Sequence, residues 1–514
     1  MTQFDFRTYP LPCAVPAWHG PVTAQQWRET AQGVVDQGGR LIAIWGGDQR
    51  SHGDGFAVHA AFSMRAGLLW ITLPVQSAFP DLSDLFPAAD RMQRAAFDLL
   101  GIAAEGAGDR RKWLRHAVWR ADEFPLRKDF ATQHPLPITH HGEADEYAFV
   151  RVEGDGVHEI PVGPVHAGII EPGHFRFSVL GERVLRLEER LGYAHKGIEK
   201  RFEQMSLQDG VRLASRISGD STVAYAWAYS MAAEAAAEMT VPARAAWLRA
   251  LCVERERVAN HLGDLGFIGN DAGLAFGLSQ FSRLKEDWLR TNMALFGHRY
   301  LMDAIIPGGM IGDLDSACRT RMALEIQTAE RDVARLKAIY EDHSGLQDRF
   351  INCGKVAPEL AARMGLTGLA GRASAQAWDL RVQFAAAPYD QLEVRMATHR
   401  NGDVAARVIV RFEEVQESLR LLRAILDKLP DGPHFTELPE VPEGRRGVGW
   451  IEGWRGEVMI ALETGAQGRI ERCHAHDPAW QNWPVLEHAV IGNIVPDFPL
   501  INKSFNLSYS GHDL

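Results

Sequence analysis

The fold is decided by residues 248–264, which read LRALCVERERVANHLGD. Apolar side chains recur there at helical spacing, and the same spacing continues over the whole segment Pro242–Tyr300. Thr240-Val241-Pro242 marks a plausible break and restart, because proline is tolerated in the first turn of a helix. The stretch therefore predicts a long helix near the centre of the chain.

Helical spacing also occurs in segments on both sides of this centre. Residues 221–233 are apolar and uncharged but too short to cross a bilayer, which predicts a buried helix. Five long helices in one domain predict a bundle around a buried centre, followed from Val448 by short strands and turns. The other four helical segments are Val179–Met205, Ala214–Met239, Asp313–Tyr340 and Gly402–Leu429.

The beginning of the chain has a different pattern. Arg40–Trp45, Phe56–Phe62 and Leu68–Leu73 are short β-prone runs bounded by glycine and aspartate, and a helix is expected over Asp84–Leu100. Residues 131–146 are rich in proline, glycine, histidine and acidic side chains without periodicity. The predicted fold is α+β: an N-terminal α+β domain (1–130), a linker (131–150), and a mainly helical bundle domain with small flanking β elements (151–514).

Composition excludes several classes of protein. The 514 residues exceed what one core usually holds, and the net charge of −11 without a basic run argues against nucleic acid as a partner. Residues 1–5 show no export signal. The five cysteines contain no CxxC pair, which excludes a self-contained iron–sulfur or zinc site of the usual spacing and fits a reducing compartment.

Three ordered motifs in the first domain carry a resemblance to a known family. They are Phe97–Ile102 (FDLLGI), Asp109–Arg111 (DRR) and Phe124–Phe130 (FPLRKDF). This series resembles the small quinone-side hydrophilic subunit of complex I. The glutamates that usually precede the aromatic-Asp pair in that family are Gln93 and Ala95 here.

The second domain resembles the large subunit of group-4 nickel–iron hydrogenases of the formate hydrogenlyase type, and its complex I counterpart. Fusion of the two domains in one chain points toward the hydrogenase-type branch. The motifs that carry the resemblance are Gly163–His166, Glu171–Arg176, Gly192–Lys200, Glu256–Asp264, Pro307–Gly309, Thr367–Ser374, Trp378–Arg381, Arg455–Glu457 and Asp497–Ile501.

The resemblance implies a nickel–iron centre held by four thiolates from two CxxC pairs. In that register, Ser218 and Ser221 replace the first pair, and Tyr225 replaces a histidine. The second pair falls within Ser504–His512, where serine and glycine stand in place of cysteine. A serine hydroxyl is a hard, usually protonated ligand and does not replace a thiolate. We therefore expect no nickel–iron centre, no cofactor bound by this chain, and an iron–sulfur cluster in a partner subunit.

The residues that bind quinone in the complex I counterpart are also absent. The resemblance implies that a histidine and a tyrosine bind the quinone head-group in that subunit. By register these positions fall near Ile170 and at Gly219. The sequence therefore matches neither active site.

A set of polar residues is expected to converge in this cleft. We leave two interpretations open: a pocket that binds a small redox molecule or relays protons, and a pocket refilled by hydrogen-bonded serines and water. For Arg455 the alternatives are a catalytic role and a structural salt bridge, with Asp220 as the candidate partner, and the salt bridge is favoured because buried arginines are commonly paired. The candidate catalytic residues are Asp220, Tyr225, Arg455 and His174; the candidate cofactor-binding residues are His166, Ser218, Ser221, Ser508 and His512; Glu171 lies with them.

Other conspicuous side chains receive structural interpretations. His195 and Glu199 have i, i+4 spacing but belong to an interface motif in the resembled families, so a metal site is not expected there. Glu256 and His261 are expected to form helix–helix hydrogen bonds. Core or interface packing is expected of Trp480, Trp483 and Phe498, and solvation of His134, His140 and His141.

The resemblance implies a peripheral-arm subunit of a membrane-bound, ion-translocating redox complex, located on the cytoplasmic side of the inner membrane. Its expected partners are an iron–sulfur small subunit, a ferredoxin-like iron–sulfur subunit and membrane-embedded antiporter-like subunits, with a quinone as a possible ligand. Two alternatives remain: an oxidoreductase with unconventional ligands, and a non-redox subunit that couples its neighbours mechanically.

Overall fold

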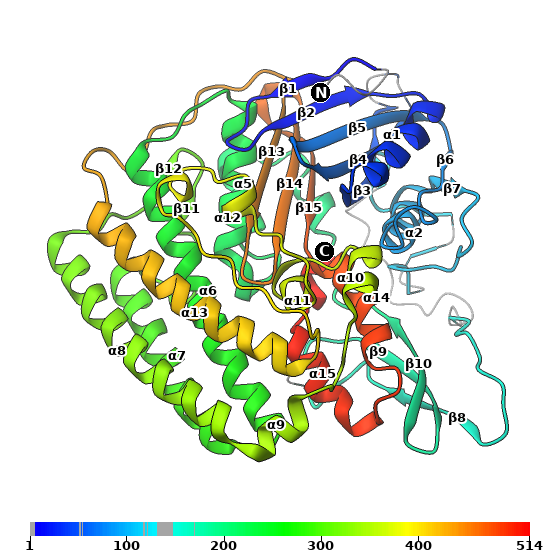
Figure 1. Ribbon diagram of the computed structural model, residues 1–514. Helices are drawn as coiled ribbons and strands as arrows, with labels where there is room; N and C mark the ends of the chain where they lie inside the picture. Colours follow the sequence, from blue (N-terminus) through cyan, green and yellow to red (C-terminus); the bar gives the residue numbers. More distant parts are fainter. Residues whose placement is uncertain are drawn as a thin grey trace.

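The computed structural model describes residues 6–50, 53, 55–116, 119–120, 122–130, 147–168 and 170–514 (Figure 1). Residues 131–146 of the predicted linker (131–150), with His134, His140 and His141, lie outside the described residues. The domain boundaries drawn from the sequence therefore stay predictions.

The N-terminal part is built on a sheet with strand order β1-β2-β5-β4-β3, in which only the β2–β5 pair is parallel. The three predicted strands are confirmed as the long strands β3, β4 and β5. The helix predicted from Asp84 begins later, at Ala89, because Pro87 disfavours helical backbone at Phe86. The elements are β1 (Tyr9–Leu11), β2 (Ala17–Pro21), α1 (Ala24–Asp36), β3 (Arg40–Asp48), β4 (Phe56–Met64), β5 (Gly67–Val75), β6 (Ala78–Pro80), α2 (Ala89–Leu100) and β7 (Ala103–Glu105).

The prediction of a helix over Val179–Met205 is wrong. That segment contains the end of β9 (His174–Leu180), the strand β10 (Arg183–Arg190) and the short helix α3 (Ile198–Phe202). Strand β9 pairs antiparallel with β10 and with the preceding strand β8 (Val157–Val162). Gly181 adopts a φ of 61° between β9 and β10, which closes a tight hairpin turn. The apolar residues on either side were therefore spaced for strands.

Two other predicted helical segments are each divided by a turn. Ala214–Met239 contains the end of α4 (Leu207–Ala214), the 3-10 turn η2 (Gly219–Ser221) and α5 (Thr222–Ala236). Pro242–Tyr300 forms α6 (Ala243–Asp271) and α7 (Ala275–Phe296), separated at Gly273, whose φ is 94°. The predictions of α8 (Ser316–Asp342) and α13 (Val404–Lys428) are confirmed.

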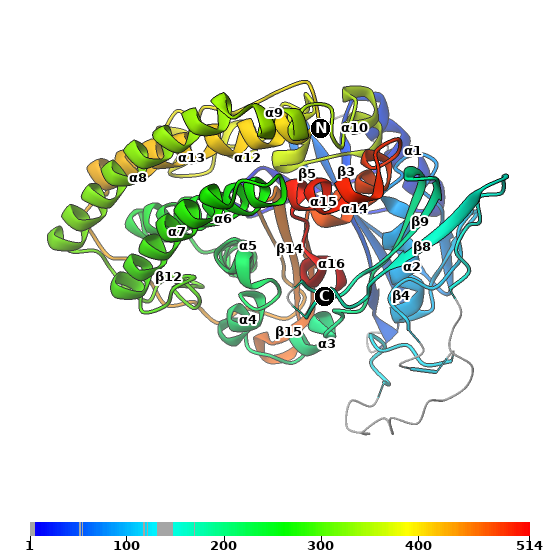
Figure 2. The same ribbon diagram turned by 90° about the horizontal axis from the view of Figure 1, so that it is seen from below.

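Helices α6, α7, α8 and α13 lie side by side and flank the central sheet β13-β14-β15, as Figures 1 and 2 show. The tail after Val448 was predicted as strands and turns; it forms these strands but then three helices. The remaining elements are β11 (Ile305–Ile306), β12 (Gly309–Met310), α9 (Ser344–Phe350), α10 (Pro358–Met364), α11 (Gly368–Ala373), α12 (Leu380–Gln383), η3 (Tyr389–Gln391), β13 (Arg446–Glu452), β14 (Glu457–Thr464), η4 (Ala466–Gly468), β15 (Ile470–His476), α14 (Ala479–Ala489), η5 (Val495–Asp497), α15 (Phe498–Phe505) and α16 (Tyr509–Asp513).

Helix α5 packs with its backbone directly on strand β13. All of its residues are buried, which confirms the predicted buried helix. A Cβ added at Gly449 would lie 1.8 Å from the carbonyl oxygen of Ala228, and one at Gly447 would lie 1.9 Å from that of Ala232. The glycines of β13 are thus required for this close approach.

The N-terminal sheet and the central sheet share one buried core. Gln481 Nε2 donates to the carbonyl oxygen of Ile42 (2.5 Å), and Arg472 Nε donates to that of Gly46 (2.9 Å). Arg91 on α2 pairs with Glu189 (3.1 Å) and Glu487 (2.7 Å). Among the described residues, no helix is long and apolar enough to span a bilayer.

The contact between β13 and α5 predicts the effect of one added methyl group. Gly449→Ala is expected to destabilise the fold by about 1–3 kcal/mol, since the backbone of α5 must move away. Gly312→Ala is the matched control, because nothing lies within 4 Å of a Cβ at that position. Thermal unfolding of both variants measures the effect. Equal midpoints for the two variants would contradict this packing.

Candidate functional site

The turn before α5 holds Asp220 in a fixed position. Asn260 Nδ2 on α6 donates to the backbone oxygen of Asp220 (2.7 Å), and Trp454 Nε1 donates to the same oxygen (2.8 Å). Ser218 Oγ donates to Asp220 Oδ1 (2.8 Å). The carboxylate therefore projects from a turn that two other elements of the fold anchor.

Arg455 reaches this carboxylate from the tight connection between β13 and β14. Its Nη1 donates to Asp220 Oδ1 (2.8 Å) and to Ser221 Oγ (3.1 Å), and its Nη2 forms a short bond to Asp220 Oδ2. Its Nε donates to the backbone oxygen of Asn506 (2.5 Å). The salt bridge predicted between Arg455 and Asp220 is confirmed, in bidentate form.

Arg455 also sets the charge state of this carboxylate. Burial alone would raise the pKa of Asp220, but the adjacent guanidinium of Arg455, helped by the Ser218 hydroxyl, lowers that pKa to about 2. Asp220 is therefore ionised at neutral pH.

The two serine positions expected to face each other do so. Ser218 Oγ lies 3.0 Å from Ser508 Oγ. Since the Ser218 hydroxyl already donates to Asp220, it accepts from Ser508. Ser508 Oγ in turn accepts the backbone N–H of Gly511 (2.8 Å) and caps α16. The hydroxyls thus have partners within the site.

Asp477 belongs to the site although sequence reasoning missed it. Tyr225 Oη donates to its Oδ2 (2.7 Å), and its Oδ1 accepts the backbone N–H of Ala479 at the start of α14 (2.8 Å). A Cβ at Gly511 would lie only 2.4 Å from Asp477 Oδ2. Burial raises the pKa of Asp477. Its only sequence signal is an aspartate that precedes Pro478 at the start of a helix.

The three candidate histidines are not brought into this hydrogen-bonded cluster. His166 Nε2 lies 2.7 Å from the Gly173 oxygen, and His174 Nδ1 lies 3.2 Å from the Gly163 oxygen, so both rings bond to backbone within their own loop segment. The ring of His512 stacks on Trp480 with centroids 4.0 Å apart and points toward the N-terminal part. Glu171 accepts the backbone N–H of Ser510 (3.3 Å).

A buried ionic network supports the Arg455 turn from behind. Arg257 donates to the carbonyl oxygens of Gly453 (2.8 Å) and Glu452 (2.9 Å). Arg372 bridges the carboxylates of Glu414 (2.7 Å) and Glu452 (2.7 Å). The network fixes the backbone that carries Arg455.

The helix–helix hydrogen bonds expected of α6 are confirmed. His261 Nε2 lies 2.7 Å from Glu414 Oε2 on α13. Glu256 accepts the backbone N–H groups of Val223 (2.7 Å) and Ala224 (3.2 Å) at the start of α5. Burial raises the pKa of Glu256 to about 8, although these two amides oppose the rise.

His195 and Glu199 bond to different partners. Glu199 pairs with Arg472 (2.8 Å) and His474 (2.7 Å), and His195 Nδ1 lies 2.7 Å from the Asp513 oxygen, so the two do not share a ligand. Buried positions are occupied by Trp480, Trp483 and Phe498. Within the described ranges, no group of three or more His, Cys, Asp or Glu side chains is arranged to hold a metal ion.

The residues present do not fit a nickel–iron centre. Soft thiolate ligands select those metals, whereas the cleft offers serine hydroxyls that bond to each other and to Asp220. The cysteines are Cys13, Cys252, Cys318, Cys353 and Cys473, and none occupies a position of the two expected pairs.

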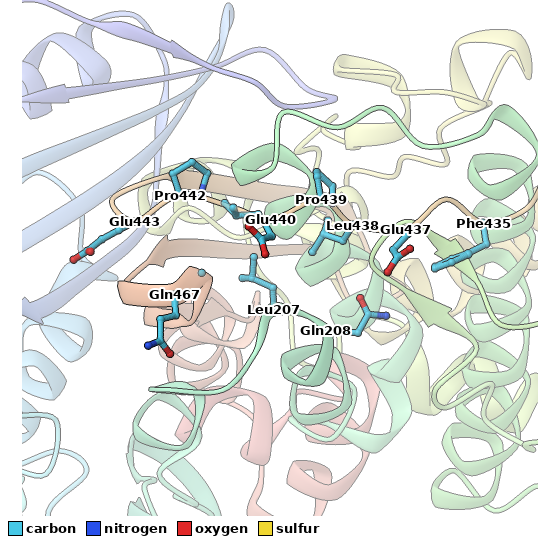
Figure 3. A pocket seen from close by; sticks show the side chains of 12 residues that line it. Leu207, Gln208, Phe435, Glu437, Leu438, Pro439, Glu440, Pro442, Glu443 and Gln467 are labelled. Atoms are coloured by element: carbon cyan, nitrogen blue, oxygen red, sulfur yellow. The ribbon is translucent and has the colours of Figure 1, made fainter.

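A groove of about 900 Å³ lies apart from this cleft (Figure 3). It runs between Leu207 and Gln208 at the start of α4 and the strap of residues 435–443. Glu437, Glu440 and Glu443 line it, and none of the residues of the Asp220–Arg455 cluster does. The groove therefore does not belong to the candidate site.

Two family models match the chain in the order that the motifs predicted. The 30 Kd subunit of respiratory-chain NADH dehydrogenase matches residues 21–135, and the 49 Kd subunit matches residues 271–446. The two matches define the class: one chain that joins regions of both subunit types.

Two relatives from Escherichia coli (strain K12) match almost end to end. Formate hydrogenlyase subunit 5 is 32% identical over 493 residues, which cover 93% of this chain and 85% of the relative. Hydrogenase-4 component G is 31% identical over 484 residues, covering 92% and 84%. The chain belongs to the family of these hydrogenase subunits.

A solved structure supports the fold. A chain from the membrane-bound sulfane sulfur reductase, an archaeal respiratory membrane complex, superposes with a TM-score of 0.66 at 24% identity. The match covers 70% of this chain and 99% of that one.

A double-mutant cycle tests the energy of the central ion pair. Arg455→Met is expected to cost about 1–2 kcal/mol by leaving Asp220 unpaired; the value is limited because 36% of the Asp220 side chain reaches solvent. The double variant with Asp220→Asn should cost less than the sum of the two single changes, measured by denaturant unfolding. Arg283 and Asp332 (3.2 Å) form an exposed control pair, with an expected coupling of about 0.5 kcal/mol or less. Additive effects at Asp220 and Arg455 would contradict the cycle.

The same pair predicts a pH dependence of stability. Because the folded pKa of Asp220 lies below its unfolded value, its stabilisation is fully present above about pH 4 and is lost as the pH falls toward 2. The free energy of unfolding of Asp220→Asn should therefore fall less between pH 4 and 2 than that of the parent chain. An equal fall in both proteins would refute the assignment.

Proposed function

We propose that this protein is a peripheral subunit of a membrane-bound redox complex related to complex I and to hydrogenases of the formate hydrogenlyase type. Membership of the family and near end-to-end similarity to two hydrogenase subunits support this role. The matches to two subunits of NADH dehydrogenase point the same way. The subunit would sit on the cytoplasmic face of the inner membrane.

The cleft of this subunit holds no nickel–iron centre. The observation that carries this part of the proposal is the bidentate pair of Asp220 and Arg455, with Ser218 and Ser508 bonded to it, at the positions where thiolates belong. Hydrogen itself is then not the substrate of this chain. Electrons would come from an iron–sulfur cluster in a partner subunit.

The cleft can still bind and move protons. Asp220 is ionised and partly open to solvent, while Asp477 and Glu256 have raised pKa values in the same neighbourhood. Such a mixture of ionised and protonated carboxyls is typical of sites that bind a polar acceptor or relay protons. A small acceptor, such as a quinone head-group, would meet Arg455 and the two serines.

Purification of the assembly from membranes tests both parts. An affinity-tagged chain is expected to elute with membrane subunits and with a protein that shows an iron–sulfur signal in electron paramagnetic resonance. Elemental analysis should find nickel far below one atom per chain. One nickel per chain would overturn the proposal for the cleft, and elution of the chain alone would overturn the role as a subunit.

A variant of the cleft separates a redox role from a mechanical one. If the cleft takes part in turnover, Arg455→Met should lower the rate of the assembly by about tenfold or more, because a charge-assisted contact is lost. Arg283→Met, which alters the surface ion pairs of Arg283 with Asp287 and Asp332, is the control. An unchanged rate with intact assembly would favour a subunit that couples its neighbours without redox chemistry.

A further inference from the structure

Several basic side chains gather beside the pair of Asp220 and Arg455. Four basic side chains lie there: Lys285 on α7, Arg411 on α13, Lys503 on α15, and Arg455 in the turn between β13 and β14. Arg455 pairs with Asp220, whereas Arg411 (2.9 Å) and Lys503 (3.3 Å) both pair with Asp264 on α6.

Lys285 is the cation left over. Among the residues that the structure describes, it forms no hydrogen bond or ion pair. Its ammonium packs against the backbone of α6, where a Cβ at Gly263 would come within 2.8 Å of Nζ. Burial lowers the pKa of Lys285; nearby Asp264 and Asp220 oppose the change, and Lys503 adds to it. A half-buried ammonium without a direct hydrogen-bond or ion-pair partner is costly unless a ligand supplies one.

The other acids of the neighbourhood do not pair with Lys285. Asp271, at the end of α6, forms no ion pair with Lys503 or Lys285 within the described part of the chain. Burial raises the pKa of Asp477, and it raises the pKa of Glu256 to about 8, which keeps Glu256 largely protonated at neutral pH. None of these carboxyls forms a direct ion pair with Lys285 in the part of the chain that the structure describes.

Solvent reaches the mouth of the cleft. Of the side-chain surface, 36% is exposed at Asp220 and 27% at Lys503. The neighbouring amides are already engaged: Asn506 Nδ2 donates to Asp264 Oδ1 (2.7 Å) and Asn260 Nδ2 to the Asp220 backbone oxygen (2.7 Å). Lys503 Nζ donates to Asn506 Oδ1 (3.3 Å) besides pairing with Asp264, so the donors that remain for a solute are its third N–H and the ammonium of Lys285.

We propose that Lys285 and Lys503 bind a small anion, a carboxylate or an oxyanion, at the mouth of the cleft between α6, α7 and α15. Ammonium groups act as point charges on such ligands and do not require the planar geometry that arginine imposes. The bound anion would lie beside the pair of Asp220 and Arg455. This inference rests on the proposed function in one respect: it names a class of ligand for the same cleft.

Isothermal titration of the purified full chain tests the site, with sulfate and acetate as probes and ionic strength held constant with chloride. At least one of the two probes is expected to bind. Lys285→Met and Lys503→Met should each weaken binding by about tenfold or more, and Lys285→Arg should retain it. Lys337→Met on α8, a lysine paired only with Glu341 (3.6 Å), is the matched control. Binding should also weaken as the pH rises through the lowered pKa of Lys285.

The outcomes separate the possibilities. Absence of binding by both probes, or equal binding in the parent and both methionine variants, overturns the anion site. If neither probe binds but Lys285→Met releases a subunit from the assembly, an acidic partner segment occupies the mouth and the proposal fails. Unfolding midpoints without anion show whether each variant is folded, and Lys503→Met keeps the test open if Lys285→Met is not. Nickel in the chain would refute the proposed function without affecting the titration.

Discussion

Buried ion pairs organise the helical half of this protein. Arg372 lies between Glu414 on α13 and Glu452 on β13, and Arg381 lies between Glu254 on α6 and Asp379 (3.1 and 2.6 Å). Removing one member of such a pair leaves an uncompensated buried charge, which costs far more than the pair contributes. Helices and strand are therefore held in one arrangement. Since the same network fixes the turn before Arg455, the geometry of the cleft depends on it.

Much of the fold could be predicted because local pattern and tertiary structure agree. The strands near Trp45, Phe62 and Leu73 are β-prone runs between glycine-containing turns, and α8 and α13 keep helical spacing throughout. The prediction from apolar spacing failed where the spacing fits both a helix and a strand. In 179–205 the apolar residues fit a helix or a strand, and the hairpin is decided by Gly181, whose left-handed backbone is invisible to a periodicity argument. Gly273 divides α6 from α7 for a similar reason.

The polar core of the candidate site could be predicted because alignment with the family motifs gives the positions of its residues. Ser218, Asp220, Arg455 and Ser508 meet as the resemblance implied. Asp477 could not be found that way, since its place depends on space that Gly511 leaves free. The histidines His166 and His174 were misplaced because their rings satisfy carbonyl groups of their own loop segment, a local choice that a motif does not reveal.

The contacts between the two halves of the chain bear on how such subunits arise. Gln481 and Arg472 donate to backbone oxygens of β3, and Arg91 reaches two carboxylates of the second half. The first half contains the match to the 30 Kd subunit of NADH dehydrogenase (residues 21–135), and the second half contains the match to its 49 Kd subunit (residues 271–446). The covalent connection then adds mainly a high effective concentration of one half near the other. A gene fusion of this kind needs no new interface, and a later split of the gene would leave the same surfaces able to find each other.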